Sequence, residues 1–194
     1  MSKGSKRSVS SYPRVIKWLD YLGKLSAQNL QKRFVVVYNA SGANIASCVI
    51  NKSSLPGFRI NQVVIKPRGF IAEAKTYFYE TDDGDEAHYL CAVLNSNVIN
   101  NRIKSIQTRG QYGERDIHRR PLMFPIPEFS RNDPRHIQLA GISKICHKKV
   151  SLMLATLRGT TAAKAKARST VKQLLAKELE KIDKLVSELL GLSS

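Results

Sequence analysis

Residues 87–127 read AHYLCAVLNSNVINNRIKSIQTRGQYGERDIHRRPLMFPIP, and this stretch decides how the rest of the chain folds. Its first part predicts a helix, because Leu90, Val93 and Leu94 recur at the spacing that places apolar side chains on one helix face. Free N–H groups and the helix dipole favour carboxylates at a helix N-terminus, and four acids stand there: Asp82, Asp83, Asp85 and Glu86. The helix is expected to end near residues 95–97, whose Asn and Ser side chains suit helix caps.

A second, shorter helix is expected over residues 98–106, with Arg102 and Lys104 on its polar face. Residues 107–120 then contain two glycines, four arginines and one tyrosine, and almost nothing that could fill a core. A loop of this kind cannot be buried without partners for its charges. It closes on the rigid Phe-Pro-Ile-Pro segment at residues 124–127, with a strand expected near residues 122–126. The pattern predicts a firmly held, arginine-rich surface for an anionic partner.

The remaining periodicities predict a helix from residue 13 to about 32, strands at residues 34–38, 45–50, 63–65 and 76–79, and helices at residues 134–158 and 171–189. Strands gathered in one region and helices in others predict an α+β fold, with a small mixed or antiparallel sheet and flanking helices. We expect a disordered basic tail at residues 1–11, an α+β domain at residues 12–130 and a helical arm at residues 131–194.

The arm is predicted from apolar residues that step by four, four, three, four and three along the last helix: Val171, Leu175, Leu179, Ile182, Val186 and Leu189. This spacing is typical of a coiled coil or a long helical hairpin. The helices could instead pack on their own domain. We favour a partner helix, from another subunit or from a second copy of the chain in a homodimer.

The formal net charge of +17 on 194 residues is the strongest global signal. An excess of this size supplies the sequence-independent part of nucleic-acid affinity, although solubility or ribosome association would also explain it. No apolar run is long enough to span a membrane, and no basic amphipathic helix carries aromatic anchors, so no membrane partner is expected. Cys48, Cys91 and Cys146 are far apart in apolar stretches, which predicts buried, reduced thiols in a cytoplasmic protein and no metal site.

Motifs for catalysis are missing from the sequence. It contains no GxGxxG or GxxxxGK[ST] phosphate loop, no nucleophile elbow, no HExxH, and no Asn/Asp-Pro-Pro-Tyr/Phe signature of adenine-N6 methyltransferases. A nuclease-like fragment, Glu73-Ala74-Lys75, lacks the second acid that would share a metal ion. We therefore expect a binding module, with a small metal-dependent nuclease and a basic RNA-binding protein as the rival hypotheses.

The residues expected to contact DNA are basic or amide-bearing. Cations hold phosphates, and Arg and Gln can read purine edges in pairs of hydrogen bonds. The set comprises Lys66, Arg68, Arg102, Lys104, Gln107, Thr108, Arg109, Tyr112, Arg115, Arg119 and Arg120. Two alternatives stay open: Arg119 and Arg120 could pair with Asp116 or Glu114 and brace the loop, and Tyr112 could be a packed anchor.

Residues 89–96, YLCAVLNS, resemble the "YLLAxLNS" helix of target-recognition domains in adenine-N6 DNA methyltransferases of the Taq type and in type I restriction specificity subunits. The Tyr12-Pro13 entry, Lys32-Arg33 before the first strand, the polar loop, the FPIP exit and the helix from Pro134 follow in the same order. The resemblance covers about residues 12–157.

The resemblance implies a domain that selects a DNA sequence and positions a target adenine for a methyltransferase, within a restriction-modification system. S-adenosylmethionine would be bound by a catalytic partner and not by this chain. The helices after such a domain dock on the methyltransferase subunit in that family, which matches residues 162–190 here. The family's single-chain enzymes carry a catalytic domain before this one, so we expect either a separate specificity subunit or a part of a longer gene.

Overall fold

The computed structural model describes residues 20, 23–73, 75–107, 109–110, 113–114, 116–156 and 169–192, with the backbone alone at residues 109, 110, 113, 114, 155 and 156. The strands are β1 (Phe34–Asn39), β2 (Ser47–Asn51), β3 (Phe58–Ile60), β4 (Val63–Ile65), β5 (Thr76–Thr81), β6 (Arg109–Gly110) and β7 (Gly113–Glu114). The helices are α2 (Gly84–Asn95), α3 (Asn97–Ile106), α4 (Pro134–Thr156) and α6 (Ala176–Leu189), with short 3-10 turns η2 (Lys52–Ser54) and η3 (Arg120–Met123). The predicted α+β class is confirmed.

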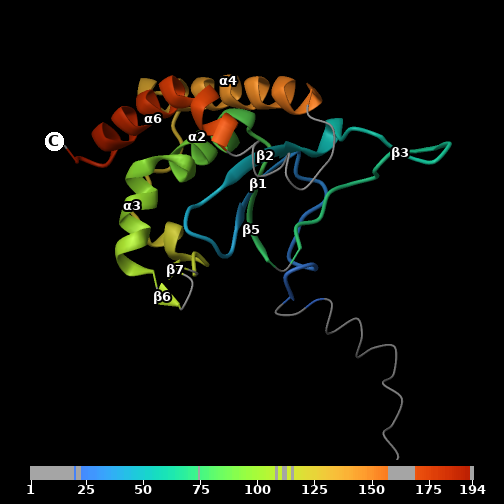
Figure 1. Ribbon diagram of the computed structural model, residues 1–194, viewed down its shortest axis with the longest axis horizontal. Helices are drawn as coiled ribbons and strands as arrows, with labels where there is room; N and C mark the ends of the chain where they lie inside the picture. The colour runs from blue at the N-terminus through green and yellow to red at the C-terminus, as the bar shows by residue number, and fades with distance from the viewer. Residues whose placement is uncertain are drawn as a thin grey trace, which may run out of the picture.

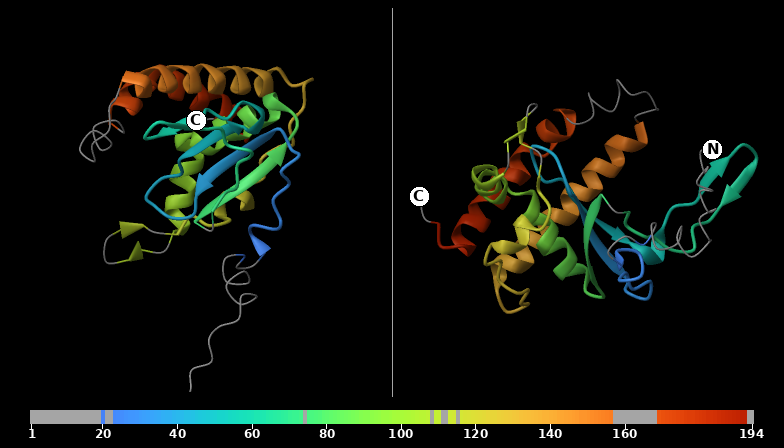
Figure 2. Two further views of the ribbon diagram at one scale, coloured as in Figure 1. Left: turned by 90° about the vertical axis from the view of Figure 1, so that its right-hand side faces the viewer. Right: turned by 90° about the horizontal axis from the view of Figure 1, so that it is seen from below.

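A three-stranded antiparallel sheet in the order β2-β1-β5 forms one layer of the fold. Val36 in β1 lies opposite Val49 in β2 and opposite Tyr79 in β5. Side chains alternate between the two faces of a strand, and Val36 and Tyr38 face the core from β1. Figure 1 shows the helices gathered on this face of the sheet, and Figure 2 shows the three strands side by side beneath α4.

Helix α2 is the centre of the molecule, because it packs on the sheet on one side and on α4 on the other. Asp83 caps its N-terminus: one carboxylate oxygen accepts the backbone N–H groups of Asp85 and Glu86 at 2.8 and 3.4 Å. Apolar side chains are buried around most of the helix circumference, including Ala87, Ala92, Val93 and Leu94. The helix predicted from the Leu90, Val93 and Leu94 spacing is therefore confirmed.

The Asn and Ser residues after Leu94 join α2 to the edge of the sheet. The Asn95 amide accepts the N–H of Ser47 at 3.0 Å and donates to its carbonyl at 2.9 Å, so it pairs with β2 as a neighbouring strand would. The Ser96 hydroxyl caps α3 by accepting the N–H of Ile99 at 3.2 Å. Asn100 accepts the N–H of Ile45 at 2.7 Å. Asn95 therefore ties α2 to strand β2, and Asn100 ties α3 to the chain that leads into β2.

The C-terminal helices lie across the top of the molecule in Figure 1 and pack on α2 and α3. Ile182 and Val186 are buried in the same core as Leu139 of α4. Within the described parts of residues 131–194, the predicted separate arm is not seen, because the apolar seam of the last helix faces the chain's own core. All of its members are buried or half-buried there: Val171, Leu175, Leu179, Ile182, Val186 and Leu189.

Polar contacts fix α6 in the same position. The carboxylate of Asp183 accepts the backbone N–H and the side-chain amide of Asn97 at 2.7 Å each, at the start of α3. Lys149 of α4 pairs with Glu178 of α6 at 2.7 Å. A carboxylate at the N-terminus of α3 is stabilised by the unpaired N–H groups there. Helix α6 is therefore bound to α3 and α4 by both apolar and polar contacts.

Other local expectations need correction. The helix predicted to reach residue 32 is not seen in its described part, where residues 24–27 form turns; residues 13–19 and 21–22 lie outside the described residues. The strand predicted near residues 122–126 is instead a 3-10 turn followed by extended chain, because Pro121 begins a tight turn. Strand β3 was not predicted. Of the three cysteines, Cys91 alone is buried, while Cys48 is exposed and Cys146 is half-buried.

Candidate nucleic-acid interface

Helix α3 carries the first group of predicted contact residues. Its apolar side holds Ile99 and Ile103 against the core, with both residues almost fully buried. Arg102 and Lys104 flank this buried side, one on each edge of it, and both are half-buried. Ile99 and Ile103 share a face because they are four residues apart, whereas residues two apart, such as Arg102 and Lys104, point in different directions. The helix therefore presents two cations beside the start of the basic loop.

Two members of the predicted set brace the loop from inside. Gln107 is buried and donates from its side-chain amide to the carbonyl of Gly42 at 3.1 Å. The guanidinium of Arg120 donates to the carbonyl of Ile106, which joins the two ends of the loop. One polar group of each side chain is thus used inside the protein, and the prediction that Gln107 and Arg120 contact DNA stays a prediction. Arg120 thus braces the loop, as the alternative in the sequence analysis suggested, but its partner is the carbonyl of Ile106 and not the carboxylate of Asp116 or Glu114.

The returning end of the loop is tied to the turn between β1 and β2. The N–H groups of Ile117 and His118 donate to the carbonyl of Ala40 at 3.1 and 3.0 Å. The hydroxyl of Tyr38 donates to the carbonyl of His118 at 3.1 Å, and Tyr38 stacks on Tyr77 with ring centroids 5.4 Å apart. Arg119 follows directly and is exposed. The backbone that leads into Arg119 is therefore held by hydrogen bonds to Ala40 and to Tyr38, which itself stacks on Tyr77.

The middle of the loop is described only in part. Arg109 belongs to the short β6–β7 hairpin, of which the backbone is described. Thr108, Tyr112 and Arg115 lie outside the described residues. For these three predicted contacts, and for the side chain of Arg109, the placement is left open.

Lys66 and Arg68 lie elsewhere, on the segment that leaves β4, and both are exposed. Figure 1 places the β3–β4 hairpin at the right-hand end of the molecule and α3, β6 and β7 at the lower left, and the view from below in Figure 2 agrees. The predicted contacts are therefore not one continuous surface. They form two groups at opposite ends: Lys66 with Arg68, and Arg102 and Lys104 with Arg119.

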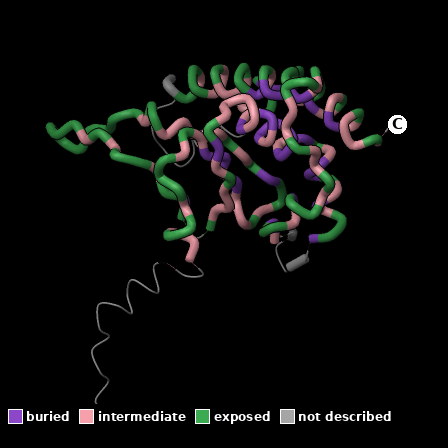
Figure 3. Tube along the Cα trace, turned by 180° about the vertical axis from the view of Figure 1, so that it is seen from behind, coloured by how far each residue is buried: buried purple, intermediate pink, exposed green. Residues whose placement is uncertain are grey.

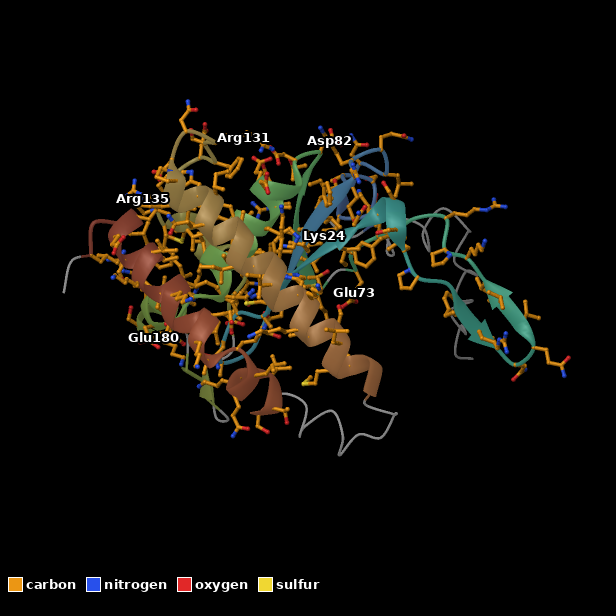
Figure 4. All side chains as sticks on the ribbon, turned by 90° about the horizontal axis from the view of Figure 1, so that it is seen from above. Lys24, Glu73, Asp82, Arg131, Arg135 and Glu180 are labelled. Atoms are coloured by element: carbon orange, nitrogen blue, oxygen red, sulfur yellow. The ribbon has the colours of Figure 1, made fainter. Side chains whose placement is uncertain are left out.

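Most of the ion pairs in the described residues join carboxylates to lysines and arginines that are not among the predicted DNA contacts. Around the start of α2, Arg131 pairs with Asp83 and Asp85 at 2.7 and 2.9 Å. Figure 4 labels Arg131 and Asp82 along this edge. The Arg135 guanidinium holds the pKa of Asp133 at about 2, well below its ordinary value. Further pairs are Lys32 with Asp82, Lys52 with Glu80, Lys144 with Asp85 and Lys149 with Glu178.

The predicted contact cations take no part in these pairs. Within the described ranges, no ion pair joins a carboxylate to Lys66, Arg68, Arg102, Lys104, Arg119 or Arg120. Asp116, offered as a partner for Arg119, lies 3.4 Å from the His118 ring instead. In the described part of the chain these cations therefore have no carboxylate partner, a feature that they share with Lys148, Lys177 and Lys181 on the C-terminal helices.

The nuclease hypothesis gains no support from the geometry. Glu73 is exposed, and its backbone carbonyl accepts from the N–H and hydroxyl of Thr76 at 3.0 and 2.8 Å. It lies apart from the other labelled carboxylates, Asp82 and Glu180 (Figure 4). Among the residues that the structure describes, no group of three or more His, Cys, Asp or Glu side chains could hold a metal ion. No helix in the described part of the chain is long and apolar enough to cross a membrane.

No protein-family model, curated protein or solved structure matches this chain.

Proposed function

We propose that this chain is a sequence-recognition domain or subunit of a restriction-modification system, which binds duplex DNA for an adenine-N6 DNA methyltransferase. The reaction would take place on a separate catalytic partner in the cytoplasm, and S-adenosylmethionine would be bound there. The proposal joins the resemblance over residues 12–157 to the distribution of charge in the structure.

One observation carries the proposal: among the described residues, the cations that pair with carboxylates are different from the predicted contact cations. The paired set stabilises the fold around the N-termini of α2 and α4. The unpaired set is exposed or half-exposed at Lys66, Arg68, Arg102, Lys104 and Arg119. Unpaired cations on a chain of net charge +17 bind a polyanion by releasing its counterions.

The contacts that we propose differ from the original set in one respect. Gln107 and Arg120 brace the two ends of the loop, so their role in the proposal is to position Arg119. Because phosphate contacts fix orientation and base contacts select sequence, selection would come from the loop residues 108–115. The Lys66–Arg68 group would engage a second segment of the same duplex.

The surface that we propose for the catalytic partner is also different from the one expected from the sequence, which was the last helix. With the seam of the last helix turned to the core, α4 carries exposed apolar residues on its outer face: Ile137, Ile145 and Leu152 are 39%, 51% and 64% exposed, and Lys148 lies among them. Gly141 lies between them on the same face with open space above it, which allows close approach of another helix. We propose that the catalytic partner docks on this face of α4.

Binding to duplex DNA as a function of salt tests the proposed function. We expect the logarithm of the binding constant to fall linearly with the logarithm of the salt concentration, with a slope of about −4.5, since each of the five cations that contact phosphate contributes about −0.9. Replacing Arg119 with Ala should reduce the magnitude of this slope by about 1. Lys148→Ala is the matched control, because Lys148 is exposed on α4 away from both groups.

Competition with single-stranded RNA separates the main rival. A chain that prefers single-stranded RNA to duplex DNA at equal salt would contradict the proposal and favour the RNA-binding hypothesis. A slope shallower than about −2 would also contradict it, because too few phosphates would be engaged.

A further inference from the structure

The β3–β4 hairpin has one face made only of apolar side chains. In its register Phe58 lies opposite Ile65, Arg59 opposite Val64, and Ile60 opposite Val63. Directly opposed residues of an antiparallel pair share a face, and successive residues alternate between faces. Phe58, Ile60, Val63 and Ile65 therefore lie together, while Arg59 and Val64 lie on the other face.

This apolar face is open to solvent. Phe58, Ile60 and Val63 are 49%, 53% and 63% exposed. Figure 3 shows the hairpin as an exposed projection, in contrast to the buried segments of the sheet and helices. Monomeric proteins rarely expose apolar groups side by side without a binding partner, and an isolated two-stranded hairpin is marginally stable in water. The face is therefore a candidate for contact with another molecule.

The base of the hairpin is held firmly. Pro56 and Pro67 stand on the two strands of chain that lead to it and restrict their backbones. Below them, Lys52 donates to the carboxylate of Glu80 at 2.6 Å and to the carbonyl of Asn29 at 2.7 Å. The side-chain amide of Gln28 exchanges two hydrogen bonds with the backbone of Ala72, at 2.6 and 2.8 Å. The hairpin is thus directed away from the body of the molecule.

The charge of the projection selects the class of partner. Residues 53–72 contain no Asp or Glu, and their charged residues are Arg59, Lys66 and Arg68. None of the three pairs with a carboxylate within the described ranges. An extended projection that is positive throughout and apolar on one face is complementary to nucleic acid, whose phosphates flank apolar sugars and stacked bases. At its tip, Asn61 and Gln62 add amide groups that can meet base edges.

We propose that the β3–β4 hairpin enters the minor groove of duplex DNA and inserts apolar side chains from its tip, Ile60 and Val63, between base pairs. Arg59, Lys66 and Arg68 would hold the flanking phosphates. The apolar face carries no donors or acceptors for the major-groove pattern, whereas minor-groove proteins use such wedges to unstack base steps and kink the duplex. This inference rests on the proposed function and deepens it, because it assigns a distortion of the DNA to a defined element.

The test uses the full chain and mixed-sequence duplexes of about 30 base pairs. The duplexes carry 2-aminopurine, whose fluorescence rises when its base is unstacked. Wild-type protein should raise the fluorescence on binding, and netropsin in the minor groove should compete, whereas methyl green in the major groove should not. The double variant Ile60→Ser/Val63→Ser should lose most of the rise while still binding. Leu152→Ser is the matched control, because Leu152 on α4 is 64% exposed against 63% for Val63.

Separate outcomes overturn the inference and the proposed function. If the wild type and the double variant bind DNA with the same fluorescence change, or if methyl green competes in place of netropsin, the hairpin inference is wrong while DNA binding stands. If the wild type binds no duplex at all, the proposed function fails as well. Arg59→Ala supplies an independent measure, since it should weaken binding and reduce the salt slope by about 1. Far-UV circular dichroism of each variant verifies that the core is intact.

Discussion

Replacing Ile182 with Ala tests whether the last helix belongs to the core of the chain or to an interface between chains. Ile182 is 2% exposed and packs in the core with Leu139 and Val186. Loss of a buried Ile side chain to Ala costs about 2–5 kcal/mol in stability. Ile182 also lines an open cavity of about 500 Å³ together with residues of β2, α2, α3 and α4, so water can enter the space that the shorter side chain leaves. We therefore expect the lower part of the range, about 2–3 kcal/mol.

Urea unfolding followed by circular dichroism measures this loss of the free energy of unfolding. The expected cost corresponds to a drop of about 4–12 °C in the thermal midpoint for a chain of this size. The unfolding midpoint of the variant should not depend on protein concentration, because the contact is within one chain. Leu152→Ala is the control: Leu152 is 64% exposed, and its replacement should change stability by about 0.5 kcal/mol or less.

Two results would refute the internal packing of α6. A cost below about 0.5 kcal/mol for Ile182→Ala would mean that the side chain is not buried in solution. A wild-type midpoint that rises with protein concentration, and a variant that loses this rise, would place Ile182 in a dimer interface. Either result would restore the original prediction of an oligomerising helix.

Two further predictions concern pH and the partner. Burial, His147 and Lys144 lower the pKa of His88 from 6.5 to about 4, so stability should be complete above pH 6.5 and decline as the pH falls towards 4. Asp85 acts in the opposite direction and raises the pKa of His88, and the Ser143 hydroxyl lies 3.1 Å from the His88 ring. The variant His88→Gln should therefore show a smaller fall in the urea midpoint of unfolding between pH 6.5 and pH 4. An equal fall in the wild type and the variant would contradict this prediction. Ile145→Arg on the outer face of α4 should reduce co-purification of a methyltransferase subunit that carries the Asn-Pro-Pro-Tyr signature, with DNA binding unchanged. Equal recovery of that subunit with wild type and variant would remove α4 as the docking face.

Local spacing was sufficient for most of the elements. The Leu90, Val93 and Leu94 pattern predicted α2, the β-branched run after Arg33 predicted β1, and the apolar repeat after Pro134 predicted α4. These signals are local, because helix and strand periodicities are properties of neighbouring residues. The same holds for the charge: the net charge of +17 and the acid-free hairpin are visible in the sequence.

The tertiary structure determines what each apolar helix face packs against. The repeat through Ile182 and Val186 is the same whether a helix meets another chain or its own core, and only the position of α4 and α2 distinguishes the two. Likewise, Gln107 and Arg120 have the composition of DNA-reading residues, yet a carbonyl elsewhere in the fold accepts each side chain. A side chain's partner depends on residues distant in sequence, so composition indicates which groups could bind an anion, and only the fold shows which of them also make contacts within the chain.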